Sequence, residues 1–226
     1  DAWPPREAVA TPFYLHSNGG AATASGDGVL SKEKPGHERP DHFVYDPLNP
    51  APTVGGALFP YPLDVPPGQF DQSPVEARPD VLCYTTPPLD QDTQLTGNVE
   101  VRLWVASTGA DTDFTAKLVH VLPDGTPLNL TDGIIRARYH QGFDRFSLLE
   151  PGKPVELSVD LAGTSNVFRA GERIRIEISS ANFPRFDRNT NTGNPIATDP
   201  DAVVVTNTLF HDSARPSHIV LPLVAR

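Results

Sequence analysis

The sequence predicts an all-β fold, a jelly-roll-like β-sandwich preceded by a long irregular wrap. Eight short runs carry the two-residue alternation or the β-branched residues of strands, and no apolar repeat at the helical period is present. The 226 residues include 25 prolines and 17 glycines, which is typical of many strands joined by turns. We expect a single domain over residues 1–226, with the wrap at 1–80 and the main strands at 81–226.

The wrap is rich in turn residues and poor in periodic patterns. Seven prolines lie between positions 47 and 67. Proline fixes φ and lacks an N–H donor, so continuous helix and central strand are excluded there. Short apolar stretches at 13–15 and 42–45 stand between the turns, and their aromatic residues argue against disorder. The pattern therefore predicts an ordered wrap around a core, with few strands of its own.

From position 81 onward the pattern is that of strands. In the clearest run, Ile174, Ile176 and Ile178 alternate with charged residues, so one face of the strand is apolar. A slip of one residue would expose all three isoleucines, and the register is therefore strongly specified. One short helix is expected at 164–168, ended by Gly171. The eight predicted strands cover 81–85, 99–105, 114–122, 134–139, 155–161, 173–180, 203–210 and 218–223.

Charge and composition exclude several classes of partner. The net charge of -10 argues against a nucleic acid or an anionic membrane surface, because both select clustered Lys and Arg. No apolar run approaches the roughly 18 residues of a membrane span, and no signal peptide opens the chain. The lone Cys83 provides no disulfide framework, which is compatible with a reducing compartment such as the bacterial cytoplasm. A start at Asp1 and the absence of methionine indicate a processed or excised piece.

The sequence contains none of the motifs that would carry chemistry. An α/β-hydrolase needs a Gly-x-Ser-x-Gly turn to present its serine, and the nearest run, 163–167, lacks the last glycine. No His-Glu-x-x-His occurs, and one cysteine cannot supply a zinc cluster. No glycine-rich phosphate loop follows a strand. The seven histidines are scattered, and His120 is expected to be half-buried and hydrogen-bonded. We therefore predict no catalytic residue, no metal ligand and no cofactor.

One polar run, 182–193, stands out. Asp187, Asn189 and Asn191 have the 1-3-5 oxygen spacing of a calcium loop. However, Gly193 falls one place late, and Thr198 occupies the position of the bidentate Glu. Asp and Asn in such runs more often bond the backbone of their own turn. The hypothesis is that these three side chains hold the loop after the 173–180 strand through backbone donors, without metal.

Eight runs of the chain carry a family resemblance: 11–15, 45–47, 52–56, 80–84, 111–118, 132–136, 164–189 and 216–222. Together they resemble the C-terminal domain of cocaine esterase-like hydrolases, over nearly the whole chain. The wider family includes X-Pro dipeptidyl-peptidases, glutaryl acylases and α-amino-acid ester hydrolases. The resemblance implies a galactose-binding-like jelly roll, with the Ser-Asp-His triad in a preceding α/β-hydrolase domain that this chain does not contain. No triad residue can be carried over to any position.

The resemblance implies an accessory domain that packs on the catalytic domain of the same polypeptide and helps to shape its acyl pocket. A homo-oligomer is also possible. Leu58 and Phe59 are apolar side chains in a run, 55–60, that glycine and proline mark as loop. Two interpretations stay open: they plug this domain's own core, or they face the catalytic domain and line the acyl pocket.

Two other functions are a carbohydrate-binding module and a self-sufficient enzyme. Related sandwiches bind sugars, and a carbohydrate-binding module would need an exposed aromatic platform. Trp3 lies in the wrap and Trp104 in a strand pattern, where core packing is expected. A self-sufficient enzyme is opposed by the missing nucleophile motif.

Overall fold

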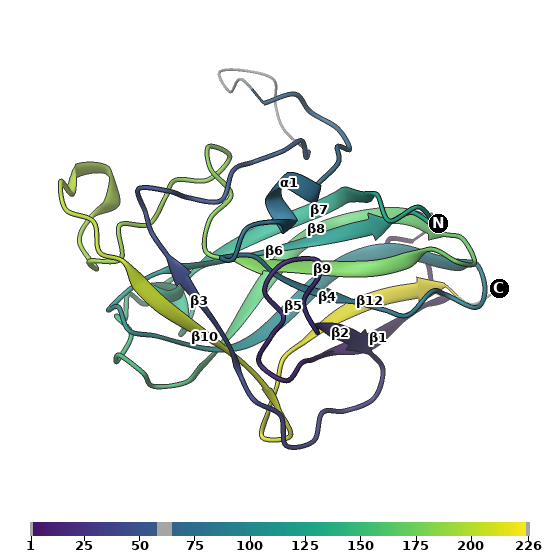
Figure 1. Ribbon diagram of the computed structural model, residues 1–226, viewed down its shortest axis with the longest axis horizontal. Helices are drawn as coiled ribbons and strands as arrows, with labels where there is room; N and C mark the ends of the chain where they lie inside the picture. The colour runs from purple at the N-terminus through teal and green to yellow at the C-terminus, as the bar shows by residue number, and fades with distance from the viewer. Residues whose placement is uncertain (1, 58–64, 225–226) are drawn as a thin grey trace.

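The computed structural model describes residues 2–57 and 65–224, which form strands joined by turns and loops (Figure 1). This confirms the all-β fold class. The helical elements of the described residues are α1 (Ser73–Glu76), η1 (Ala137–Tyr139) and η2 (Ile196–Thr198). The wrap supplies β1 (Ala8–His16), β2 (Val29–Ser31) and β3 (Asp41–Tyr45). The other strands are β4 (Leu82–Thr85), β5 (Thr93–Ser107), β6 (Asp113–Val121), β7 (Pro127–Arg136), β8 (Val155–Phe168), β9 (Arg173–Ser179), β10 (Val205–Asp212), β11 (Arg215–Pro216) and β12 (His218–Val224).

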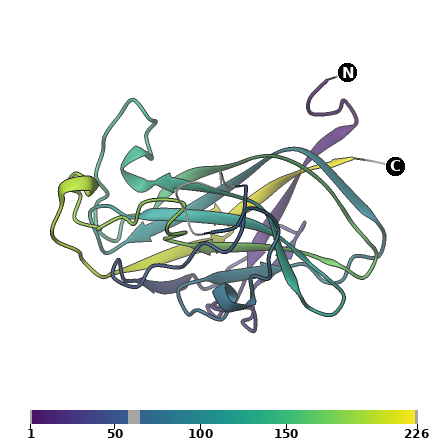
Figure 2. The same cartoon turned by 90° about the horizontal axis from the view of Figure 1, so that it is seen from above.

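The strands form one hydrogen-bonded path that bends round into two facing layers (Figure 2). The path runs β11-β10-β5-β12-β1-β2-β4-β9-β6-β7, with β3 paired to β10 and β8 paired to β5. At its far end, β7 comes back against β8. There the Thr131 hydroxyl donates to the Leu161 carbonyl, and a Cβ on Gly133 would lie 2.1 Å from the Asp160 carbonyl oxygen. The jelly-roll-like sandwich expected from the sequence is therefore present.

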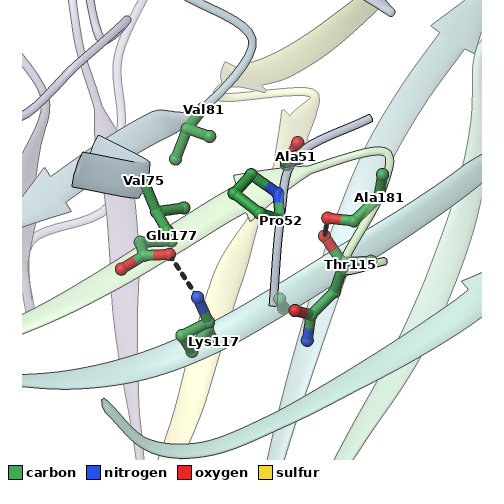
Figure 3. A pocket seen from close by; sticks show the side chains of 11 residues that line it. Ala51, Pro52, Val75, Val81, Thr115, Lys117, Glu177 and Ala181 are labelled. Carbon is green, nitrogen blue, oxygen red and sulfur yellow. Dashed lines mark hydrogen bonds and ion pairs between the residues drawn. The ribbon is translucent and has the colours of Figure 1, made fainter. Parts of the chain in front are cut away.

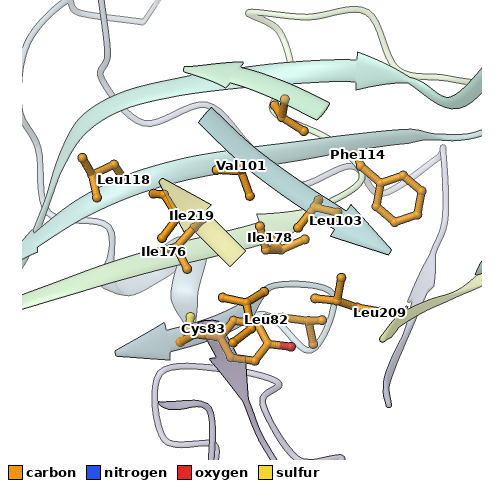
Figure 4. Close-up of a cluster of buried hydrophobic side chains, with 14 of the residues drawn as sticks. Leu82, Cys83, Val101, Leu103, Phe114, Leu118, Ile176, Ile178, Leu209 and Ile219 are labelled. Atoms are coloured by element: carbon orange, nitrogen blue, oxygen red, sulfur yellow. The ribbon is translucent and has the colours of Figure 1, made fainter. Parts of the chain in front are cut away.

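The core lies between the two layers (Figure 4). Val101 and Ile219, on the paired strands β5 and β12, are fully buried in one apolar cluster with Ile176 and Ile178 of β9. Full burial of such a side chain stabilises the fold by about 1.5–3 kcal/mol. The alternation in β9 thus sets the face it buries, as the sequence predicts.

The wrap contributes more to the sheet than expected. β1 lies between β12 and β2, with Phe13 paired to Ile219. In β3, Phe43 and Tyr45 point inward while His42 and Val44 are exposed. The aromatic stretches that interrupt the turns are therefore strand segments, because only pairing places their side chains against the core while satisfying their backbone groups.

The structure corrects several boundaries. The predicted helix at 164–168 is wrong: these residues extend β8, which pairs with β5 from Thr93 opposite Phe168 onward. Pairing with β5 satisfies the backbone groups on one edge of the run and overrides its weak helical signal. The short helix α1 was not predicted; it begins at Ser73, whose amide donates to the side chain of the preceding Asp71 at 2.8 Å. The strands predicted at 134–139 and 203–210 are β7, which ends at position 136, and β10, which begins at 205.

Charged residues on the opposite face of β9 are also buried, whereas the sequence predicted that this face would be exposed to solvent. Arg175 and Glu177 are only 8% and 4% exposed, because α1 and its neighbours cover them. Glu177 lies 2.9 Å from Lys117, and Arg175 pairs with Glu76 of α1. Figure 3 shows the Lys117–Glu177 pair beside a cavity of about 10 Å³, which is room for a single water-sized group. The wrap thus seals a layer of ion pairs against the outer face of the sheet.

This sealed layer makes stability depend on pH. Burial, and next the charge of Glu177, raise the pKa of Glu76 to about 7 from 4.5. A pKa raised on folding means stability that is full below about pH 4.5 and is lost as pH rises through about 7. The loss for this shift is about 3 kcal/mol at most. Urea unfolding at several pH values should show Glu76→Gln less sensitive to pH than wild type over this range.

The exposed Glu156 of β8 offers a matched control. Glu156→Gln removes one carboxylate from the surface and should leave the pH profile of unfolding as in wild type. Identical pH profiles for Glu76→Gln and wild type would contradict the burial of a titrating Glu76.

Candidate functional site

One end of the sandwich, opposite the two chain ends, gathers the long loops (Figures 1 and 2). These are residues 46–57 after β3, 137–154 after β7 and 180–204 after β9. Hereafter they are called the loop end. Loops carried on a rigid sandwich are where such folds place binding surfaces.

A buried polar cluster holds the loop end together. Asp111 and Asp113, both fully buried, stand at the start of β6. Arg138 lies 2.6 Å from Asp111 and Arg136 lies 3.0 Å from Asp113. The Asn189 side-chain amide donates to both carboxylates, at 2.8 and 2.7 Å. The Asn189 side chain thus links two carboxylate–guanidinium pairs. These hydrogen bonds fix the 180–204 loop to the start of β6.

Burial outweighs the nearby guanidinium at one carboxylate of this cluster. It raises the pKa of Asp113 to about 6, although the hydrogen bond and charge of Arg136 act in the opposite direction. The same carboxylate raises the pKa of Arg136 through its hydrogen bond, against the effect of burial. The pair is ionised at neutral pH and makes its charge-assisted hydrogen bonds there.

The structure separates the three polar residues predicted in the 182–193 run. Asn189 Oδ1 accepts from the Asn191 amide at 2.9 Å, and Asn191 Nδ2 donates to the Val203 carbonyl at 2.6 Å. Asn191 has φ +64°, a left-handed conformation that Asn tolerates well. Asp187 is exposed instead. Spacing alone groups the three residues; it cannot reveal Asp111 and Asp113, which lie more than 70 positions earlier in the chain.

Beside the cluster lies an open groove of about 390 Å³. The Tyr139 and Phe143 rings are 5.9 Å apart, and the Arg185 guanidinium stacks on the Phe186 ring at 5.3 Å. The groove combines aromatic faces with the charges of four lining residues. It is lined by Asp113, Ile134, Arg136, Tyr139, Phe143, Arg185, Phe186 and Asp187.

Large apolar side chains are exposed on the same loops. Phe143 is 82% exposed and Leu48 is 73% exposed. Leu148, of the 137–154 loop, packs against Gly193 of the 180–204 loop, so these two loops share the surface. Within the 137–154 loop, the Arg138 guanidinium lies 4.9 Å from the Phe146 ring. Exposed apolar residues gathered in this way mark an interaction surface. Those on the loop end are Leu48, Phe143, Phe146, Leu148, Phe183, Val203 and Val204.

Leu58 and Phe59, the predicted pocket-lining residues, lie outside the described residues. Ala57, the last described residue before them, lies beside the groove, because its carbonyl accepts from Arg185 Nη1 at 3.2 Å. Arg185 forms an ion pair with Asp132 at 3.1 Å.

A second polar group has the residue types of a hydrolytic triad but different connections. Ser17 Oγ lies 3.1 Å from His211 Nε2, and His211 Nδ1 lies 3.2 Å from Glu38. However, Ser17 donates to Asp41 at 2.6 Å, and Asp41 also lies 2.8 Å from His211 Nε2. Since both ring nitrogens face carboxylates, the ring has no free lone pair with which to take the serine proton.

Sequence reasoning missed this group, although one signal was available. In β10, Val205, Asn207, Leu209 and His211 alternate on the buried face. A histidine that continues an apolar alternation is buried, and a buried histidine needs hydrogen-bond partners. His120, by contrast, is half-buried and 2.6 Å from Glu172, in agreement with its prediction.

Within residues 2–57 and 65–224, no group of three or more His, Cys, Asp or Glu side chains is placed to hold a metal ion. No helix in the same ranges is long and apolar enough to cross a membrane.

Comparison with known proteins finds relatives among larger proteins that are named as esterases. It is 44% identical to cocaine esterase of Rhodococcus sp. (strain MB1 Bresler) over 226 residues, covering 99% of this chain and 39% of that protein. A putative serine esterase of Mycobacterium bovis is 34% identical over 124 residues, covering 47% of the chain and 20% of that protein.

Two solved structures of larger proteins also resemble this chain over nearly all of its length. An aminopeptidase from a marine sediment Thaumarchaeota archaeon superposes with a TM-score of 0.87 at 28% identity, covering 100% of this chain and 38% of that one. An α-amino acid ester hydrolase gives a TM-score of 0.85 at 29% identity, covering 98% and 38%. The chain thus spans under two fifths of either structure.

The family described as the X-Pro dipeptidyl-peptidase C-terminal non-catalytic domain matches residues 1–220, nearly the whole chain. This match, the two-layered sandwich and the resemblance first drawn from the sequence runs agree. The chain belongs to the X-Pro dipeptidyl-peptidase C-terminal non-catalytic domain family.

Proposed function

We propose that this chain is the accessory domain of a serine hydrolase of the acyl or ester hydrolase or X-Pro dipeptidyl-peptidase type. In this role it packs its loop end against the catalytic α/β-hydrolase domain and helps to shape the acyl pocket. The observation that carries the proposal is the loop end itself, where exposed apolar side chains lie on the loops around a groove beside Ala57.

The chemistry of this surface suits a partner domain. Apolar and aromatic side chains lose water favourably on contact, while the charged rim of Arg136, Arg185 and Asp187 can fix the orientation of the partner. The buried Asp111–Asn189 cluster keeps the loops in place before contact, which lowers the entropic cost of association.

The relatives support hydrolysis of acyl bonds. Two of them bear the names of esterases, and the solved structures are those of an ester hydrolase and an aminopeptidase. An acyl pocket that receives side chains from a second domain can discriminate acyl groups by size. This supports placing Leu58 and Phe59 in that pocket.

The test is Phe59→Ala. In the full-length enzyme we expect kcat/KM for bulky acyl esters to change by about 10-fold or more relative to acetyl esters, since pocket contacts are worth about 1–3 kcal/mol. The isolated domain should stay nearly as stable as wild type. Val9→Ala, an exposed change on β1, is the control and should alter neither property.

Unchanged acyl preference would remove the pocket role. If Phe59 instead plugs the domain's own core, its truncation should cost the isolated domain roughly 3 kcal/mol or more in the free energy of unfolding.

The carbohydrate-binding alternative has less support. Trp3 is exposed, but its ring lies over Gly163 and its Nε1 donates to Asn98, while Trp104 is half-buried on β5. Titration of the isolated chain with neutral sugars distinguishes the two functions: saturable binding would favour the module. An ester-hydrolysis assay on the same chain tests for activity of its own.

A further inference from the structure

His211 of β10 joins the wrap to the sandwich through two acids. Its side chain is fully buried, with Nδ1 3.2 Å from Glu38 and Nε2 2.8 Å from Asp41. A neutral imidazole has one N–H donor and one nitrogen with a lone pair. That second nitrogen would place its lone pair opposite a carboxylate oxygen, with no proton between them. Only the imidazolium satisfies both acids.

Asp41 is held as the carboxylate by further donors. It accepts from the Ser17 hydroxyl at 2.6 Å, the Tyr84 hydroxyl at 2.7 Å and the Ala21 amide at 2.8 Å. Burial alone would raise the pKa of Asp41, but the hydrogen bonds, that of His211 first, lower it. Asp41 therefore carries a negative charge opposite His211 near neutral pH.

The charged and titratable groups around His211 come from five strands and the loop between β2 and β3. Glu38 stands between β2 and β3, and it also pairs with His16 of β1 at 2.8 Å. Asp41 begins β3, and the Tyr84 ring of β4 lies 6.1 Å from the imidazole. On β10 itself, the adjacent Asp212 is paired with Arg215 of β11 at 2.5 Å.

The local balance favours a cation. Burial alone would lower the pKa of His211, but the hydrogen bond to Asp41 and the charges of Asp41 and Glu38 raise it above 6.5. A group whose pKa rises on folding stabilises the fold fully below its unfolded value, here about 6.5. That contribution is lost as pH rises through the folded value.

We propose that His211, Glu38 and Asp41 form a pH-sensitive latch, in which the imidazolium fastens the wrap segment 17–41 to β10 and β4. Loss of the proton leaves two carboxylates facing a neutral ring, so the segment loosens at alkaline pH while the core layers stay paired. The latch depends on none of the residues of the loop end and goes beyond the accessory role.

The first test observes the imidazole directly. In the wild-type chain, the ¹⁵N shifts of the His211 ring near pH 6.5 should show both nitrogens protonated in the major form. A spectrum with one protonated nitrogen at that pH would overturn the proposal, whatever the behaviour of any variant.

The second test follows the Ala21 amide, which donates to Asp41 and so reports on the segment. Its hydrogen-exchange protection, corrected for intrinsic rates, should fall several-fold between about pH 6.5 and 9, because loss of the His211 proton frees the segment to open. The Ile176 amide in the core should change much less. Parallel changes at Ala21 and Ile176 would overturn a local latch.

The matched variants are His211→Gln and His42→Gln. Ala21 protection in His211→Gln should be lower near pH 6.5 and show no further alkaline loss. His42 is exposed on β3, with Nδ1 3.0 Å from Thr208, and His42→Gln should keep the wild-type profile. If folded His211→Gln still loses Ala21 protection at alkaline pH as wild type does, another titrating group causes that loss and the latch is overturned. If that variant does not fold, the wild-type ring spectrum still decides.

Discussion

Replacing Asp111 by alanine is expected to lower the free energy of unfolding by about 4 kcal/mol, because it removes one partner of a buried ion pair. Arg138, only 6% exposed, would lose its carboxylate, and Asn189 would lose one of its two acceptors. The Arg138 backbone amide, which donates to Asp111 at 3.0 Å, would also be left without that partner. Urea unfolding of the two proteins measures the difference.

Asp187→Ala is the matched control for this experiment, since it removes an exposed acid from the same end of the domain. From the sequence alone, a loss of about 1 kcal/mol or more would be expected for a turn-holding Asp. Its exposure reduces the expected change to within about 0.5 kcal/mol. A loss below about 1 kcal/mol for Asp111→Ala would mean that Arg138 reaches solvent, and the cluster would not be what holds the loop.

Gly133→Ala is expected to cost about 3 kcal/mol, the upper part of the range for overpacking in a rigid site. Its new Cβ would lie 2.1 Å from the Asp160 carbonyl oxygen, where β7 meets β8. Both contacting groups are fixed in paired strands, so relief requires β7 and β8 to separate. Thermal unfolding, with hydrogen exchange at Leu161 and Thr131, measures both effects.

Gly36→Ala provides the comparison. A Cβ at Gly36 would meet nothing within 4 Å, so its effect should stay within about 0.5 kcal/mol. Equal stability of the two variants would show that the two layers do not close tightly between β7 and β8.

Local alternation determined much of this fold in advance. The β-branched residues of β9, and Val99 to Val105 in β5, bury one face whatever their partners, because successive side chains of a strand point to opposite sides. The all-β class, most of the strands from β4 onward and the family resemblance could therefore be predicted from short stretches of chain. The spacing of Asn189 and Asn191 likewise indicated a polar loop.

Tertiary structure decided everything that depends on distant partners. Residues 164–168 are strand because β5 supplies backbone partners along one edge of the run. Arg175 and Glu177 are buried because α1 covers a face whose sequence reads as solvent-exposed. Asn189 finds its acids 76 and 78 positions away, and His211 meets Asp41 across 170 positions. A buried polar group must find partners, but the periodicity of one strand carries no information about which segment supplies them.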